Sequence, residues 1–155
     1  MTPQQNSVLN TLKAQLIAAL GILEGMETPA LNFPPMILKW MAAVSHWEGA
    51  NPTLYNPGNL KFSTLTASWG ATKGPAASDG GYLCQFKTLE AGQFALCSFL
   101  QLGCEDQLVA FHAPEARTLA GFTVVYAGNP PQGYIDGIEE MLGVPGTTQI
   151  STFMS

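Results

Sequence analysis

One carboxylic acid stands out because of its neighbours. Glu48 ends an apolar stretch that begins near Met36, and Trp47 directly precedes it. Apolar surroundings favour the protonated form of a carboxylic acid, which can then act as a general acid. The loop sequence that follows, residues 51–60, carries amides and an aromatic ring of the kind that holds a sugar. This combination predicts cleavage of a glycosidic bond.

The alternative for Glu48 is an ordinary water-exposed residue at a helix end. A negative charge at a helix C-terminus opposes the helix dipole and costs stability. An acid in such an unfavourable place is better explained by function, so we favour the catalytic role.

Helical patterning accounts for most of the elements that position this acid. The segment that delivers Glu48 is apolar nearly all round, as expected of a central buried helix, and Pro34-Pro35 suits its first turn. Thr88 is typical of an N-cap, with Glu90 in the first turn of the next helix. The predicted helices cover residues 5–24, 36–47, 89–103, 115–127 and 131–142.

A small β element is predicted between the second and third helices. Residues 49–81 are rich in Gly, Pro, Asn, Ser and Thr. Strand-like pieces occur at 59–62, 64–69 and 82–86, separated by turn sequences, which favours a small antiparallel sheet or hairpin. The expected fold class is therefore α+β, mainly α, with two lobes in one domain.

The length and patterning also predict a division of the chain. The 155 residues suffice for one domain with a substantial core. We expect an N-terminal helix or arm over residues 1–30, a central domain over 31–144 and a C-terminal tail over 145–155.

Composition argues against several classes of partner. Only 11% of the residues are charged, the six basic residues occur singly, and the net charge is -5, which disfavours nucleic acid. No run approaches the roughly 18 apolar residues of a membrane span. The N-terminal sequence lacks the pattern of a secretory signal, so we expect synthesis in the cytoplasm and delivery by other means.

The cysteines and histidines show no metal-binding spacing. Cys84, Cys97 and Cys104 form no CxxC motif, and His46 and His112 belong to no HExxH motif. We expect buried, reduced thiols, no metal and no cofactor.

Three segments together resemble the lysozyme-like superfamily, in particular the phage and bacterial peptidoglycan-cleaving branch related to lytic transglycosylases. Residues 47–52 (WEGANP) are similar to the catalytic-glutamate motif of that family. Residues 55–60 (YNPGNL) and 86–96 (FKTLEAGQFAL) resemble its NPGN and F-x-T-x-E-A-G-x-x-A-L signature. Residues 126–130 (YAGNP), followed by Tyr134 and Ile138, are similar to its late tyrosine region. The resemblance spans about residues 36–144.

The resemblance implies a lysozyme-like, two-lobed domain that cleaves the glycan strands of peptidoglycan. Glu48 would be the general acid/base of a muramidase or a lytic transglycosylase, with no cofactor. The lack of a signal peptide fits a phage product that acts in the periplasm or cell wall, or within a virion among other virion or tail proteins. The candidate substrate-binding residues are Tyr55, Asn56, Asn59, Ser63, Trp69 and Tyr126.

Most of these binding candidates have a structural alternative. Asn56 and Asn59 would either bind an N-acetyl group or fix their loop. Tyr55 and Trp69 would either stack on sugar rings or pack in the core. Tyr126 resembles the family tyrosine that approaches the scissile sugar, and its alternative is helix packing.

A second catalytic acid is not evident in the sequence. Two-acid glycosidases place their carboxyl groups roughly 5 to 10 Å apart. Between Glu48 and Glu90 the only other acid is Asp79, in the turn sequence Asp79-Gly80-Gly81, and we interpret it as a turn former. The absence of a second catalytic acid fits the transglycosylase-like branch, in which the substrate's own hydroxyl attacks. Hydrolysis by a water held by Ser63, Thr64 or Ser68 remains open.

Two other classes of function remain open. A virion or tail-associated structural protein would keep the fold with little or no activity, and the acidic balance suits it. A carbohydrate-binding module would depend on Tyr55 and Trp69 and not on Glu48. Fold alone does not decide among the three classes, because function belongs to the site.

Overall fold

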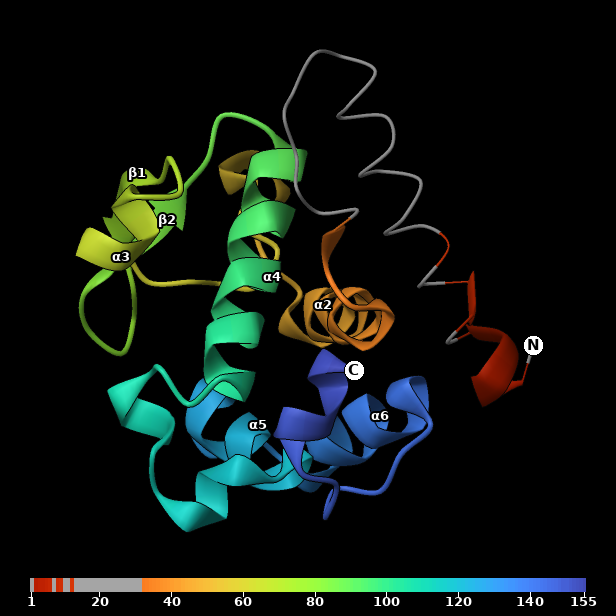
Figure 1. Ribbon diagram of the computed structural model, residues 1–155. Helices are drawn as coiled ribbons and strands as arrows, with labels where there is room; N and C mark the ends of the chain where they lie inside the picture. The colour runs from red at the N-terminus through yellow and green to blue at the C-terminus, as the bar shows by residue number, and fades with distance from the viewer. Residues whose placement is uncertain (1, 7, 10–11, 13–31) are drawn as a thin grey trace.

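The computed structural model describes residues 2–6, 8–9, 12 and 32–155 (Figure 1). This part of the chain is mainly helical with one two-stranded antiparallel sheet, which confirms the predicted class, α+β and mainly α. Most of the predicted helix over 5–24, and most of the arm over 1–30, lies outside the described residues. None of the described helices is both long enough and apolar enough to cross a bilayer.

Helix α2 (Pro35–Glu48) is the central element and confirms the helix predicted from Met36 to Trp47. Pro35 occupies the first turn, where its missing N–H is not needed. Gly49 ends the helix in the left-handed conformation with φ +56°. The ring of Trp40 is buried and lies 4.8 Å from the ring of Phe122, centroid to centroid. A buried helix therefore fixes the backbone position of Glu48.

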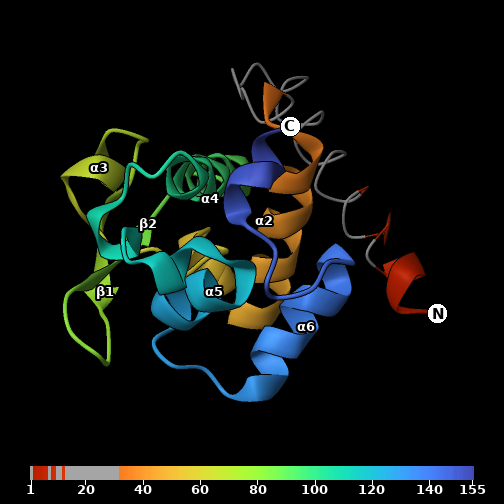
Figure 2. The same cartoon turned by 60° about the horizontal axis from the view of Figure 1, so that its bottom comes forward.

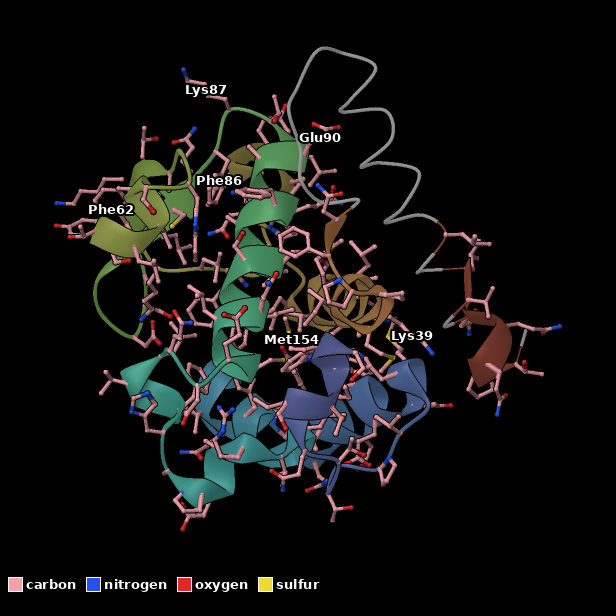
Figure 3. The ribbon with its side chains drawn as sticks, viewed as in Figure 1. Lys39, Phe62, Phe86, Lys87, Glu90 and Met154 are labelled. Atoms are coloured by element: carbon pink, nitrogen blue, oxygen red, sulfur yellow. The ribbon has the colours of Figure 1, made fainter. Side chains whose placement is uncertain are left out.

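Three further helices surround α2: α4 (Leu89–Cys104), α5 (Leu119–Ala127) and α6 (Gln132–Leu142). Thr88 caps α4 as predicted, because its hydroxyl accepts a hydrogen bond of 3.2 Å from the Ala91 N–H. Figure 2 shows α6 beside α2, and Lys39 joins the two by donating to the Leu142 carbonyl at 3.0 Å (Figure 3). The helix predicted from 131 to 142 is confirmed, because α6 begins one residue later and ends at the predicted residue.

The predicted start of α5 at residue 115 is wrong. Pro114–Arg117 forms the short 3-10 helix η4, and Thr118 then caps α5 by accepting from the Gly121 N–H at 3.2 Å. The two segments meet so closely that a Cβ at Gly121 would lie 1.5 Å from the Glu115 carbonyl oxygen. Glycine at 121 therefore permits the turn that separates η4 from α5.

The β element differs from its prediction in two of three pieces. Strands β1 (Thr72–Ala76) and β2 (Tyr82–Gln85) form the hairpin, so only the predicted piece at 82–86 is a strand. Residues 64–69 are wrong as a strand: they contain helix α3 (Thr64–Ala67), which Ser63 and Thr66 stabilise through a reciprocal capping box. Of residues 59–62, Lys61 alone pairs with β2, through a bridge to Leu83.

The residues after 144, expected to be a tail, pack into the same core as the helices. They form the 3-10 helix η5 (Ile150–Met154), in which Ile150 and Phe153 are buried. Phe153 is 2% exposed, and its ring lies 5.3 Å from that of Trp40. The Leu119 N–H donates to the Thr148 carbonyl at 2.9 Å, so this segment also holds the start of α5.

All three cysteines are free and buried, as predicted. Burial raises the pKa of each thiol, that of Cys104 to about 12. These thiols therefore stay protonated at neutral pH and act as small apolar groups.

Replacement of Phe153 by alanine tests whether the C-terminal residues belong to the core. We expect Phe153→Ala to lower the free energy of unfolding by about 3 to 5 kcal/mol, because it opens a cavity against Trp40. Urea denaturation followed by tryptophan fluorescence measures this change. Ser151→Ala, at an exposed position of the same segment, is the matched control. Equal small losses from both variants would contradict the core role.

Candidate active site

A cleft of about 740 Å³ contains Glu48 and separates the β lobe from the helical lobe. In Figure 1 the β lobe, with α3, β1 and β2, lies to one side of α4, and α5 and α6 lie below. The 3-10 helix η3 (Val109–Phe111) contributes to the helical side. The β side of the cleft is residues 58–61, 63, 65–66, 76–79 and 83, and the helical side is residues 99, 110–111 and 125–128.

Both carboxyl oxygens of Glu48 accept hydrogen bonds from neutral groups. The Tyr134 hydroxyl of α6 donates to Oε1 at 2.7 Å, and the Asn59 side-chain amide donates to Oε2 at 3.0 Å. Within the described part of the chain, no ion pair includes Glu48. The half-buried carboxyl group is thus oriented from two sides and keeps acceptor capacity for a ligand in the cleft.

Asn59 is a positioning residue, and its own backbone explains how. It adopts the left-handed region with φ +50°, which asparagine tolerates better than most residues. Its amide nitrogen also donates to the Glu48 backbone carbonyl at 3.3 Å. Since both partners on Glu48 are acceptors, the nitrogen and not the oxygen of this amide must face them. Asn59 therefore links the end of α2 to the loop that lines the cleft.

Asn56, a substrate-binding candidate, instead fixes this loop. It is 1% exposed, and its amide nitrogen donates to the carbonyls of Leu60 and Cys84 at 2.9 and 3.1 Å. Its oxygen accepts from the Leu60 N–H at 2.9 Å. These bonds leave no exposed face for a sugar, so the structure favours the loop-fixing alternative.

Tyr126 joins the helical lobe to the same loop. It lines the cleft, and its hydroxyl donates to the Gly58 carbonyl. A Cβ at Gly58 would lie 2.6 Å from both this hydroxyl and a methyl of Leu96, so glycine allows the close approach. Burial raises the pKa of Tyr126 well above its usual value, and the Glu48 charge raises it further. Tyr126 therefore serves as a hydrogen-bond donor beside Glu48.

Tyr134 is the site residue that sequence reasoning missed, although it was part of the motif that resembles the lysozyme-like family. It lies on the buried face of α6 with Ile135, Ile138 and Leu142. Burial raises the pKa of Tyr134, and the hydrogen bond to Glu48 raises it further. A polar hydroxyl on an otherwise apolar helix face was the available signal, because a buried hydroxyl needs a partner.

The remaining candidates fall in different places. Ser63 lines the cleft while it also caps α3. Tyr55 is 42% exposed and lines a separate hollow of about 260 Å³, with Pro57 and Leu89. Trp69 is part-buried against the core and is not among the described residues that line the cleft. Of the six binding candidates, the structure brings Asn59, Ser63 and Tyr126 to the cleft with Glu48.

Asp79 also lines the cleft, at the turn of the hairpin. Its carboxylate accepts from the Lys61 ammonium at 2.6 Å, and this bond lowers the pKa of Asp79. The ammonium donates to the Gly80 carbonyl at 2.8 Å as well. Asp79 is thus a turn residue, as interpreted from the sequence, that also adds a negative charge to the cleft.

The described residues contain no cluster suited to a metal ion. Among them, no group of three or more His, Cys, Asp and Glu side chains is arranged to hold a metal ion.

Comparison with protein-family models found no matching family, and comparisons with curated proteins and with solved structures found no significant match.

The raised pKa of Tyr134 predicts a difference between the native and the denatured protein. Unfolded tyrosines ionise near pH 10, whereas the folded Tyr134 keeps its proton, so alkaline pH favours unfolding. In an ultraviolet titration at about pH 10, the native phenolate signal of Tyr134→Phe is expected to equal that of the wild type. In denaturant, the same variant loses the signal of one of the four tyrosines. Equal losses in both states would contradict the burial of this hydroxyl.

Proposed function

We propose that this protein cleaves the glycan strands of peptidoglycan, with Glu48 as the general acid and then the general base. The observation that carries the proposal is the Glu48 carboxyl group, held in the cleft by Tyr134 and Asn59 on its two oxygens. An acid/base catalyst must be positioned within hydrogen-bonding reach of the atom it protonates. Two anchors from separate elements provide that positioning.

The neutral character of the two anchors supports a role in proton transfer. A cationic partner would strongly favour the charged form of the carboxyl group. Tyrosine and asparagine orient the group by hydrogen bonds without adding a positive charge. In the proposed mechanism, Glu48 donates a proton to the glycosidic oxygen and accepts one in the next step.

The arrangement of the cleft supports a mechanism with one acid. Asp79 is the other carboxylate among the described lining residues, and its oxygen is engaged by Lys61. With Glu48 acting alone, the attacking group is a hydroxyl of the substrate or a water. Ser63 lines the cleft, whereas Thr64 and Ser68 are not among the described lining residues, so Ser63 is the better candidate to hold a water.

We further propose that the fold is lysozyme-like and that the protein acts on the bacterial cell wall as a phage product or as part of a virion. Two lobes flank a cleft, and a buried helix delivers the acid to it, as the motif resemblance implies. A virion structural protein with an inactive site is the competing function, and loss of activity on Glu48→Gln separates the two.

Digestion of purified peptidoglycan sacculi tests the catalytic role of Glu48. We expect the wild-type protein to release fragments and Glu48→Gln to lower the rate by about 100-fold or more, since general acid catalysis is lost. Mass spectrometry distinguishes anhydro ends, made by a transglycosylase, from reducing ends, made by a hydrolase. Glu90→Gln is the matched control, because Glu90 lies at the N-terminal end of α4 outside the cleft (Figure 3). If the wild-type protein released no fragments, the proposed enzymatic activity would be contradicted.

Tyr134→Phe tests the anchoring of the carboxyl group. We expect a rate about 10- to 100-fold below wild type, because Tyr134 would stabilise the charge that develops on Glu48 as it gives up its proton, and a hydrogen bond to a charged group contributes about 1.5 to 3 kcal/mol. Thermal unfolding establishes whether the variant remains folded. Tyr82→Phe, on the exposed hairpin, removes a hydroxyl away from Glu48 and is expected to retain full activity. Wild-type rates for folded Tyr134→Phe would show that this anchor is dispensable.

A further inference from the structure

Lys61 is the only positively charged side chain among the described residues that line the cleft. Its ammonium contacts the Asp79 carboxylate at 2.6 Å and the Gly80 carbonyl at 2.8 Å. The Lys61 and Asp79 side chains are 44% and 75% exposed. Exposed ion pairs contribute only about 0 to 1 kcal/mol, so a ligand can replace Asp79 at little cost.

The backbone of Lys61 is held firmly although its ammonium is exposed. Lys61 forms a bridge with Leu83, and the neighbouring Phe62 N–H donates to the Tyr82 carbonyl at 2.8 Å. The Thr66 hydroxyl donates to the Lys61 carbonyl at 3.3 Å. A flexible, charged side chain on a fixed base can exchange one acceptor for another without rearrangement of the cleft wall.

The other charges in the cleft define what Lys61 would recognise. Glu48 and Asp79 place two carboxyl groups there against one ammonium. The Asp79 carboxylate repels an anionic substrate, and Lys61 is the one described lining side chain whose charge attracts it. The other polar lining side chains, such as Asn59, Ser63 and Thr66, are neutral and do not select by charge.

We propose that Lys61 binds a carboxylate of the substrate in place of Asp79, and so selects glycans that carry carboxylates over neutral chains of amino sugars. In peptidoglycan the carboxylate belongs either to the lactyl group of muramic acid or to an attached peptide. The inference rests on the proposed function, because it places the glycan in the cleft that holds Glu48.

Asp79 has a defined place in this arrangement. It competes with the substrate for the ammonium, so its removal has the opposite effect from removal of Lys61. A purely structural ion pair, which tethers the turn at residues 77–81, behaves differently, because loss of either partner then has the same effect. The two single variants therefore separate recognition from tethering.

Isothermal titration calorimetry in the Glu48→Gln background, where the ligand is not consumed, tests the proposal. The probes are a neutral tetramer of N-acetylglucosamine, an alternating tetrasaccharide with N-acetylmuramic acid and free lactyl groups, and its peptide-bearing form. The peptide-bearing form carries carboxylates on the peptide alone, since its lactyl groups are amides. Its response distinguishes the two sources of the carboxylate.

We expect Lys61→Met to weaken binding of a carboxylate-bearing probe by about 5- to 10-fold and to leave the neutral tetramer unchanged. Asp79→Asn binds the anionic probe as tightly or more tightly. Added salt weakens the Lys61-dependent part of the affinity. In the Lys61→Met/Asp79→Asn double variant, any remaining effect of Asp79 measures its repulsion alone.

Two results would overturn the proposal. Equal weakening of neutral and anionic probes by Lys61→Met would show that Lys61 only shapes the cleft. Weakening by Asp79→Asn that matches Lys61→Met would show that the ion pair tethers the turn. If the wild-type protein still cleaves sacculi, either result leaves the proposed function standing. Failure of every probe to bind, together with intact sacculi, would overturn both.

Discussion

A carboxylic acid at the end of a buried helix needs partners inside the protein, and this requirement organises the structure around Glu48. Burial of α2 fixes the Glu48 backbone, and Gly49 turns the chain away in the left-handed conformation. A half-buried carboxyl group without hydrogen bonds is costly. Tyr134 and Asn59 satisfy it from α6 and from the loop beyond η2 (Pro52–Leu54). The site thus depends on the packing of α6 against α2 and on the course of that loop.

The loop that carries Asn59 is itself fixed by bonds from distant parts of the chain. Asn56 holds it to Leu60 and to the Cys84 carbonyl of β2, and Tyr126 holds it to α5 through Gly58. The N-terminal part of α4 packs so closely on the loop that a Cβ at Gly92 would lie 1.8 Å from the Tyr55 carbonyl oxygen. Asn56, Gly58 and Gly92, which belong to the NPGN and E-A-G motifs, therefore fix the loop that carries Asn59. Of the asparagines and glycines in these motifs, Asn59 is the one that contacts the Glu48 carboxyl group.

Charge is distributed unevenly over the cleft. Neutral donors surround Glu48, whereas the exposed pair of Lys61 and Asp79 lies at the turn of the hairpin. Separation of the two environments keeps a positive charge from direct contact with the Glu48 carboxyl group. It also leaves the Lys61 ammonium, the one cation among the described residues that line the cleft, exposed to a ligand. Glu48 and the exposed ion pair thus occupy different electrostatic environments of one cleft.

Elements with local sequence signals were predicted correctly. Pro35 and Gly49 bound α2, Thr88 caps α4, and the apolar run before Glu48 marks a buried helix. The strand expected at 64–69 was wrong because the Ser63–Thr66 capping box outweighed β propensity. Strand β1 was not predicted because Lys73-Gly74-Pro75 lacks a strand pattern. The bonds from Tyr134 to Glu48 and from Tyr126 to Gly58 span 86 and 68 residues. These contacts could not be predicted from the sequence, because they depend on how whole helices pack and not on the spacing of neighbours in the chain.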